Sequence, residues 1–106
     1  MSAAFLMVTT TLRGPDEARA LAHTLVEARL AACVQILPIE SVYRWQGAVE
    51  SAAEHLLLCK VRADDYAAVE SAIRERHPYD VPEIVAVAIT AGAQPYLDWL
   101  AASTAR

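Results

Sequence analysis

The spacing of apolar residues changes along the chain, and each change predicts a new secondary-structure element. Residues 4–11 are mostly apolar and β-branched, a pattern typical of a buried strand. After Gly14 and Pro15, apolar residues recur at helical spacing, with acidic residues in the first turn. We therefore expect a strand followed by an amphipathic helix that ends near Leu30.

The middle of the chain predicts an unusually long β-hairpin. Residues 33–45 and 54–62 are strand-like, and Gln46-Gly47 between them predicts the reversal. Pro38 interrupts the first strand and suggests a bulge or an edge position. A hairpin of this length should extend past the compact core, and its exposed strands invite pairing with another chain.

The second half of the chain has a helix and a strand on either side of a stiff segment. A helix capped by Asp64 should end at Arg76, where a His-Pro pair stops it. Residues 77–83 contain two prolines and no Gly, Asn or Ser, so we expect an extended, rigid connector. An apolar strand over residues 84–89 and a short helix opened by Pro95 complete the chain.

The predicted order of elements is βαββαβ with an additional C-terminal helix. In a chain of 106 residues this order is typical of a single-domain α+β ferredoxin-like sandwich, in which two helices cover one face of an antiparallel sheet. The other face of the sheet then lacks a cover, although the fully apolar strand at residues 84–89 predicts burial on both faces. We therefore expect one domain over residues 1–106 that uses a copy of itself as the second cover.

Composition narrows the classes of partner. The chain has a formal net charge of −4 and no basic cluster, so we do not expect nucleic-acid binding. Its apolar N-terminal run lacks a basic start and is too short to span a bilayer, so we predict a cytoplasmic protein without membrane insertion. Hydrophobic residues make up 56% of the chain, which again leaves apolar surface for a partner copy.

Cysteines and histidines are the candidate metal ligands. Cys33 and Cys59 lie on the two predicted strands of the hairpin, at similar distances from its turn, so pairing would place them nearly opposite each other. Two thiolates with a histidine, either His55 near Cys59 or His77 in the connector, would suit Cu(I) or Zn. The alternative is that both cysteines are small, buried core residues.

Enzymatic chemistry has little support in the sequence. There is no Ser-His-Asp pattern, no Gly-rich phosphate loop and no HExxH motif. Asp80 and Glu83 are close in sequence, and His77, Tyr79 and Lys60 could donate protons, but no residue is identified as a nucleophile. On these residues alone, an enzyme is the weaker interpretation.

Aromatic and charged residues concentrate in the hairpin and the connector. If these segments meet at a subunit boundary, their side chains would form a polar pocket with aromatic walls. The alternative is an interface rim in which the same side chains only hydrogen-bond between subunits. The candidate ligand-binding residues are Tyr43, Trp45, Lys60, His77, Tyr79 and Glu83.

Motifs along the chain resemble the CutA family of divalent-cation tolerance proteins. The most specific motif is His-Pro-Tyr-Asp-Val-Pro-Glu-Ile at residues 77–84, and the resemblance runs through nearly the whole chain. The other motifs are residues 27–34, 39–47, 57–60 and 96–100.

This resemblance implies a ferredoxin-like fold that assembles into a tight homotrimer similar to PII signalling proteins, with hairpin strands building sheets between subunits. It also implies tolerance of copper and other divalent metals, proposed copper binding and no established enzymatic activity. The family's recurrent polar residues gather in clefts between subunits, which is where the resemblance places the candidate ligand-binding residues. Asp80, Ala48 and Val61 depart from the glutamate, lysine and threonine that are usual in the family. The last two departures could weaken anion binding.

Our leading hypothesis is a non-enzymatic, cytoplasmic homotrimer that binds copper or another divalent metal ion through Cys33, Cys59 and His77. The alternative is a PII-like signalling or scaffold trimer whose clefts between subunits bind a small anionic ligand or a partner protein. The thiols matter most in the first case. Lys60, together with His77 and Glu83, matters most in the second.

Overall fold

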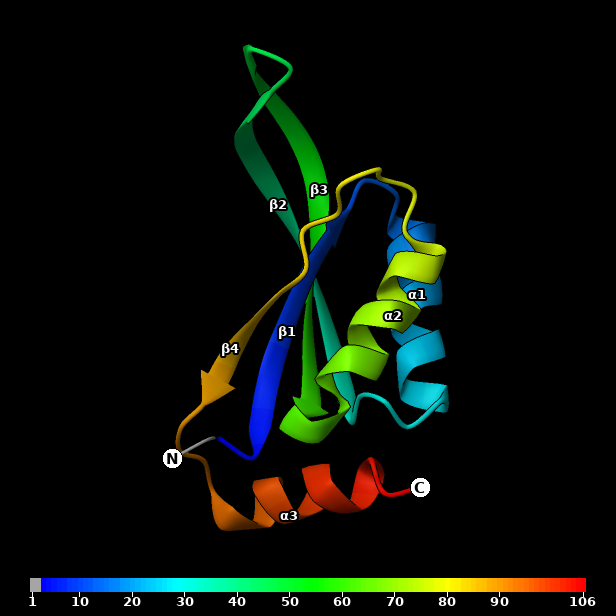
Figure 1. Cartoon of the computed structure of the whole chain (residues 1–106), viewed down its shortest axis with the longest axis vertical. Helices are drawn as coiled ribbons and strands as arrows, with labels where there is room; N and C mark the ends of the chain where they lie inside the picture. Colours follow the sequence, from blue (N-terminus) through cyan, green and yellow to red (C-terminus); the bar gives the residue numbers. More distant parts are fainter. Residues whose placement is uncertain (1–2) are drawn as a thin grey trace.

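The computed structural model describes residues 3–106, in which helices cover one face of an antiparallel sheet (Figure 1). The elements, in order, are β1 (Phe5–Leu12), α1 (Pro15–Glu27), β2 (Cys33–Trp45), β3 (Ala48–Arg62), the 3₁₀ helix η1 (Ala63–Asp65), α2 (Tyr66–Arg76), β4 (Val85–Ile89) and α3 (Gln94–Ser103). The strands lie in the order β2-β3-β1-β4, and each neighbouring pair is antiparallel. This arrangement confirms the predicted α+β ferredoxin-like fold with an additional C-terminal helix.

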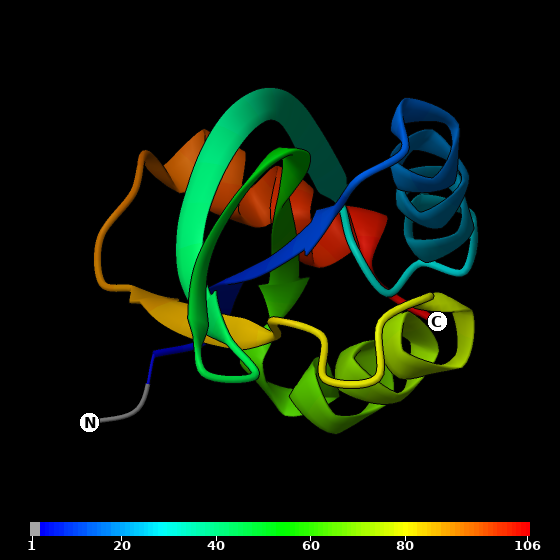
Figure 2. The same ribbon diagram turned by 90° about the horizontal axis from the view of Figure 1, so that it is seen from above.

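The hydrophobic core lies between the sheet and the helices α1 and α2, which run side by side on one face (Figures 1 and 2). Alternate residues of β1 and β3 point toward these helices, and Val8, Leu57 and Cys59 are fully buried among them. Each helix contributes one apolar stripe, which includes Leu25 of α1 and Ile73 of α2. Burial of each such large side chain contributes roughly 1.5–3 kcal/mol to folding.

The opposite face of the sheet, here called the outer face, carries apolar side chains that remain partly or largely exposed in the subunit. Val85 and Val87 of β4 expose 51% and 53% of their surface, so the burial predicted for both faces of this strand is absent from the single chain. The register places the following apolar residues on the outer face: Phe5, Met7, Leu37, Leu56, Leu58, Val85 and Val87.

The hairpin extends beyond the sheet, as predicted. β3 begins at Ala48, earlier than expected, but it pairs with β1 only from His55 onward. Residues 39–54, here called the hairpin arm, therefore pair only with each other and reach past the helices (Figure 1). Gln46 and Gly47 make the turn with φ angles of 50° and 81°, the left-handed region that a tight hairpin turn requires.

Two local features differ from the predictions, and a third decides between two predicted alternatives. α1 ends at Glu27 rather than near Leu30, because Arg29 adopts a left-handed φ of 61° that cannot continue the helix. Of the two alternatives for Pro38, the edge position is confirmed and the bulge is absent, because β2 is the edge strand and continues through the proline, whose missing N–H is tolerated there. Asp64 does not cap α2, because it lies within η1, and neither helix has a side-chain cap.

α3 crosses the end of the sheet opposite the hairpin arm (Figure 1). Leu100 is fully buried, whereas Tyr96 and Trp99 expose 41% and 46% of their surface. Arg62 holds the helix, because its guanidinium donates to the Thr104 hydroxyl over 2.9 Å and to a helix carbonyl over 2.7 Å.

Candidate functional site

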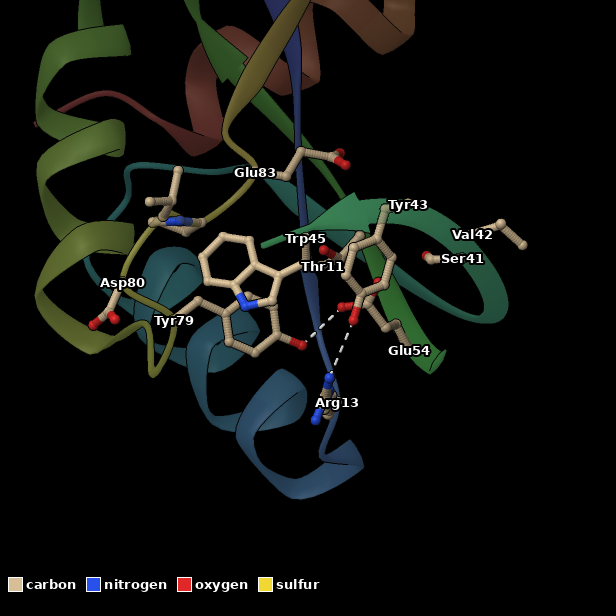
Figure 3. Close-up of a pocket in the computed structure, with 12 residues that line it drawn as sticks. Thr11, Arg13, Ser41, Val42, Tyr43, Trp45, Glu54, Tyr79, Asp80 and Glu83 are labelled. Atoms are coloured by element: carbon tan, nitrogen blue, oxygen red, sulfur yellow. Dashed lines mark hydrogen bonds between the residues drawn. The ribbon is translucent and has the colours of Figure 1, made fainter. Parts of the chain in front are cut away.

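A cavity of about 680 Å³ lies between the hairpin arm and the connector at residues 77–83 (Figure 3). The end of β1 forms its third side. Its volume falls within the range of roughly 300–1,000 Å³ that is common for small-molecule sites. The lining residues are Thr11, Arg13, Ser41, Val42, Tyr43, Trp45, Glu54, Tyr79, Asp80, Val81, Pro82 and Glu83.

His77 holds the connector against the end of β1. Its Nε2 donates to the backbone oxygen of Thr11 over 2.8 Å, and its Nδ1 accepts the backbone N–H of Tyr79 over 3.3 Å. The His77 and Tyr79 rings also pack edge to face, with centroids 4.7 Å apart. Because Pro78 and Pro82 fix their own φ angles, these few contacts position the whole segment.

Tyr79 joins the connector to the base of the hairpin arm. Its hydroxyl donates to Oε2 of Glu54 over 2.7 Å, and Glu54 itself is 7% exposed (Figure 3). Burial, followed by the bond to Glu54 and the charge of that carboxylate, raises the pKa of Tyr79 well above its usual value. The phenol therefore stays protonated and acts as a fixed hydrogen-bond donor.

Arg13 connects the end of β1 to the hairpin arm. Its guanidinium donates to the Tyr43 hydroxyl over 3.2 Å, and this bond is the main cause of the raised pKa of Arg13. Nδ1 of His55 lies 3.2 Å from the backbone oxygen of Arg13 and steadies the same turn. Trp45, which is 45% exposed, adds an open aromatic surface to the cavity (Figure 3).

Comparison with known proteins places this architecture in a family. The model of the family described as CutA1 divalent ion tolerance protein matches residues 6–103. The chain belongs to this family. It is 46% identical over 99 residues to the divalent-cation tolerance protein CutA of Thermus thermophilus, covering 92% of this chain and 96% of that protein. It is 42% identical over 100 residues to the chloroplastic protein CutA of Arabidopsis thaliana, covering 93% of this chain. The chain spans 55% of the length of that plant relative.

Solved CutA structures share the fold. CutA from Synechococcus elongatus superimposes with a TM-score of 0.94 at 38% identity, covering 98% of this chain and 93% of that chain. CutA1 from Oryza sativa gives a TM-score of 0.94 at 39% identity, covering 99% of this chain and 97% of that chain. The resemblance to the CutA family inferred from the sequence motifs is thus confirmed.

The structure brings together most of the predicted ligand-binding residues of this CutA1 family member. Tyr43, Trp45, Tyr79 and Glu83 line the cavity, and Glu83 also accepts a hydrogen bond from a β1 threonine over 3.2 Å. His77 is not among the lining residues, but it packs against the Tyr79 ring and hydrogen-bonds to the Tyr79 backbone, which supports the connector. The binding roles assigned to these residues stay predictions, but their convergence is a property of the fold.

Lys60 lies away from the other predicted cleft residues within one subunit. It is six positions beyond Glu54 on the same strand, or about 20 Å at roughly 3.3 Å per residue. Its Nζ donates to Oε1 of Gln35 on the neighbouring strand over 2.8 Å. A cleft that includes Lys60 would therefore need this residue from another copy of the chain.

The expected pairing of Cys33 with Cys59 is wrong by one residue. Cys33 pairs with Lys60, and Cys59 pairs with Val34, so the two thiols point to opposite faces of the sheet. Cys59 lies in the core, where burial, followed by the nearby charge of Cys33, raises its pKa to about 12. The two sulfurs of one subunit therefore do not form a joint metal site.

The histidines also do not complete a metal site within residues 3–106. Both ring nitrogens of His77 already have hydrogen-bond partners, so binding a metal ion would break one of these bonds. His55 uses Nδ1 in its contact with the Arg13 backbone. No group of three or more His, Cys, Asp or Glu side chains in the described part of the chain could hold a metal ion. The predicted set Cys33, Cys59 and His77 does not fit such an ion in one subunit.

Arg13 and Glu54 are site residues that the sequence predictions missed. Neither lies in an aromatic or proline-rich motif, and each reaches the cavity only because β1 pairs with the hairpin at its base. Glu54 carried one usable signal, because it is a charged residue beside the apolar part of β3. Nothing in the local sequence pairs it with Tyr79.

Proposed function

We propose that this protein contributes to divalent-cation tolerance as a homotrimer without enzymatic activity. The observation that carries the proposal is the match of residues 6–103 to the CutA1 divalent ion tolerance family. The Thermus thermophilus relative, which this chain covers almost entirely, is named a divalent-cation tolerance protein. The proposal extends that name to the present chain.

Two features of the subunit support self-assembly. The outer face of the sheet leaves apolar side chains open, and covering them with a copy of the chain removes that surface from water. The hairpin arm adds backbone groups that pair with no other strand of the same subunit on their free edges. Docking of further copies against the sheet would cover the apolar outer face and could also pair the free edges of the hairpin arm.

Metal binding within this proposal falls to Cys33 rather than to the full predicted set. Cys33 lies on the outer face, beside the surface that other copies would cover, whereas Cys59 is buried in the core. We propose that copper or another divalent metal ion binds at Cys33 together with groups from neighbouring subunits. Cys59 and His77 would contribute only after rearrangement of the contacts that now engage them.

Native mass spectrometry of the reduced protein, with and without Cu(I) or Zn, tests assembly and metal binding together. We expect a trimer that retains a whole number of ions, loss of those ions in Cys33→Ala, and retention in the matched control Cys59→Ala. A monomer would overturn the assembly proposal. Retention of metal by Cys33→Ala would move the metal site elsewhere.

A second candidate function is that of a PII-like signalling or scaffold trimer. The specific observation that favours it is the 680 Å³ cavity, whose aromatic and charged walls come from three separate segments. Such a trimer would bind a small ligand or a partner protein in the cavity without metal. Equilibrium dialysis against a metabolite mixture, with chelator present, would detect the ligand, and an empty cavity across the mixture would count against this function.

Cellular location stays a prediction. No helix among residues 3–106 is long and apolar enough to cross a membrane. We propose a cytoplasmic location, although the structure from Archaeoglobus fulgidus is described as periplasmic. Fractionation of the source cells with compartment markers would decide between the two.

A further inference from the structure

Acidic side chains outnumber basic ones around the cavity. Glu54, Asp80 and Glu83 contribute three carboxylates to the lining, and Arg13 contributes the one guanidinium among the described residues. Lys60, the other cation expected there, lies on a distant part of the sheet. The residues that one subunit contributes to the lining therefore carry a formal charge of −2, which attracts a cation to this part of the cavity.

Glu54 is the least solvated of these carboxylates. It is 7% exposed, and the hydrogen bond recorded to it comes from the neutral phenol of Tyr79. Within residues 3–106 it forms no ion pair, because the Arg13 guanidinium donates to Tyr43 instead. Buried carboxylates normally have a cationic partner, because a hydrogen bond from a neutral donor offsets less of the hydration free energy that the carboxylate loses on burial. Residues 3–106 of one subunit thus place no positive group in direct contact with Glu54.

The walls of the cavity indicate what kind of cation would fit. Tyr43, Trp45 and Tyr79 contribute aromatic rings to the same cavity as the Glu54 carboxylate, and Trp45 keeps 45% of its surface open (Figure 3). Aromatic faces attract ammonium and guanidinium groups, and they also cover attached hydrocarbon. A small hydrated metal ion would instead need several oxygen ligands at close range. The described residues offer no group of three side chains for such an ion.

We propose that the cavity binds a small organic cation, with its ammonium group against Glu54 and its hydrocarbon part against Trp45. This proposal names the ligand class for the second candidate function and rests on it. The carboxylate supplies the charge recognition, and low local polarity strengthens that attraction. Tyr79 orients the carboxylate, and Glu83, which also lines the cavity, adds a second negative charge.

A set of three probes of similar size and different charge tests the proposal. Isothermal titration calorimetry of the assembled protein would compare phenethylammonium, the neutral 3-phenylpropanol and the anionic 3-phenylpropionate. We expect the ammonium to bind about tenfold or more tightly than the alcohol, and the anion to bind most weakly. Equal binding of all three, or preference for the anion, would overturn the proposal. The same samples on native mass spectrometry report trimer and metal, so failure here leaves the tolerance proposal separately testable.

Carboxylate variants locate the bound cation. Glu54→Gln keeps the shape and an acceptor for Tyr79 but removes the charge, and we expect it to lower phenethylammonium affinity about tenfold or more. Glu27→Gln, the same change on exposed α1, is the matched control and should bind normally. If Glu54→Gln fails to assemble, Glu83→Gln provides the second variant, with a smaller expected loss. Unchanged affinity in an assembled Glu54→Gln, or in both variants, would contradict the site.

Fluorescence gives an independent location. The chain has two tryptophans, so in a Trp99→Phe background the signal reports Trp45 alone. Phenethylammonium should change that emission with the dissociation constant measured by calorimetry, whereas 3-phenylpropionate at the same concentration should not. Calorimetric binding without any change at Trp45 would place the cation outside the cavity and contradict the proposal.

Discussion

His77 accepts the backbone N–H of Tyr79 at Nδ1 over 3.3 Å, an arrangement that requires a neutral histidine ring. Its Nε2 lies 2.8 Å from the backbone oxygen of Thr11, which can only accept a hydrogen bond, so Nε2 carries the proton. A second proton on Nδ1 would place two donors against each other. Protonation of His77 would therefore release the backbone of Tyr79 and loosen one wall of the cavity.

This arrangement predicts a loss of stability at mildly acidic pH. Burial lowers the pKa of His77 below 6.5, opposed by the bond to Thr11 and by the charges of Glu17 and Glu54. The unfolded chain therefore takes up this proton at a higher pH than the folded chain does. The contribution of His77 to stability is complete above pH 6.5, falls as the pH drops below it, and levels off below the folded-state pKa. Urea unfolding at fixed protein concentration across this range measures the fall.

Histidine variants identify the residue responsible. His77→Gln should lose the part of the pH dependence that lies just below pH 6.5, and the exposed His23→Gln on α1 should keep it. The ¹⁵N chemical shifts of the His77 ring should also show the tautomer with its proton on Nε2. An unchanged pH profile in His77→Gln would show that the acid sensitivity arises elsewhere.

The fold could be predicted because its signals are local. The period of apolar residues in β1 and α1 fixed their types, and Gln46-Gly47 identified the hairpin turn. The prolines of residues 77–83 predicted an extended, rigid connector, and the structure has a connector there that belongs to no helix or strand but bends at residues 79–81. In each case the residues that determine the geometry are neighbours in the sequence, so no knowledge of tertiary packing was needed.

The candidate site was harder to predict because it depends on strand register. A shift of one residue in the pairing of β2 with β3 decides whether Cys33 and Cys59 lie on the same face of the sheet or on opposite faces. Pro38 in the sequence did not indicate which of these two registers forms. Similarly, Glu54 meets Tyr79 from 25 residues away, and Arg13 joins them through the pairing of β1 with β3. The connector residues were found because they form a motif, whereas their partners form none.

Tyr79→Phe should destabilise the protein by about 1–3 kcal/mol. The substitution removes the donor that satisfies the buried Glu54 carboxylate and leaves that acceptor without a protein partner. Denaturant midpoints at neutral pH and fixed concentration would measure the loss. Tyr96→Phe on α3 is the matched control, since Tyr96 is 41% exposed, and it should change stability by less than about 0.5 kcal/mol. Equal effects of the two substitutions would mean that the bond between Tyr79 and Glu54 contributes nothing.

The ion pair between Arg106 and Asp65 should contribute to stability, while the pair between Arg19 and Asp16 should not. Arg106 contacts both carboxylate oxygens of Asp65, over 2.7 and 3.2 Å, and the Asp65 side chain is 14% exposed. The Asp16 side chain is 98% exposed, so water screens its pair with Arg19 at 3.0 Å. Double-mutant cycles with Asp→Asn and Arg→Gln changes should give a favourable coupling for the first pair only. Equal couplings would show that the two-point contact adds nothing.

Two threonine-to-valine substitutions should change stability in opposite directions. Thr10 is fully buried, and its hydroxyl has no hydrogen-bond partner among residues 3–106, so Thr10→Val should stabilise the protein by about 1 kcal/mol. Thr104 is also buried, but its hydroxyl donates to the Leu100 carbonyl over 2.8 Å and accepts from Arg62 over 2.9 Å. Thr104→Val removes both bonds and leaves the charged guanidinium partly unsatisfied, so it should destabilise by about 1–3 kcal/mol.

Urea midpoints of the two threonine variants, compared at the same concentration, test this pair. The chemical change is identical and both sites are buried, so only the hydrogen bonds of the hydroxyl differ. A loss of stability in both variants would mean that the Thr10 hydroxyl has an acceptor, for example an internal water molecule, because buried waters commonly satisfy such groups. A gain of stability in Thr10→Val, without a gain in Thr104→Val, would show that the buried Thr10 hydroxyl destabilises the folded state.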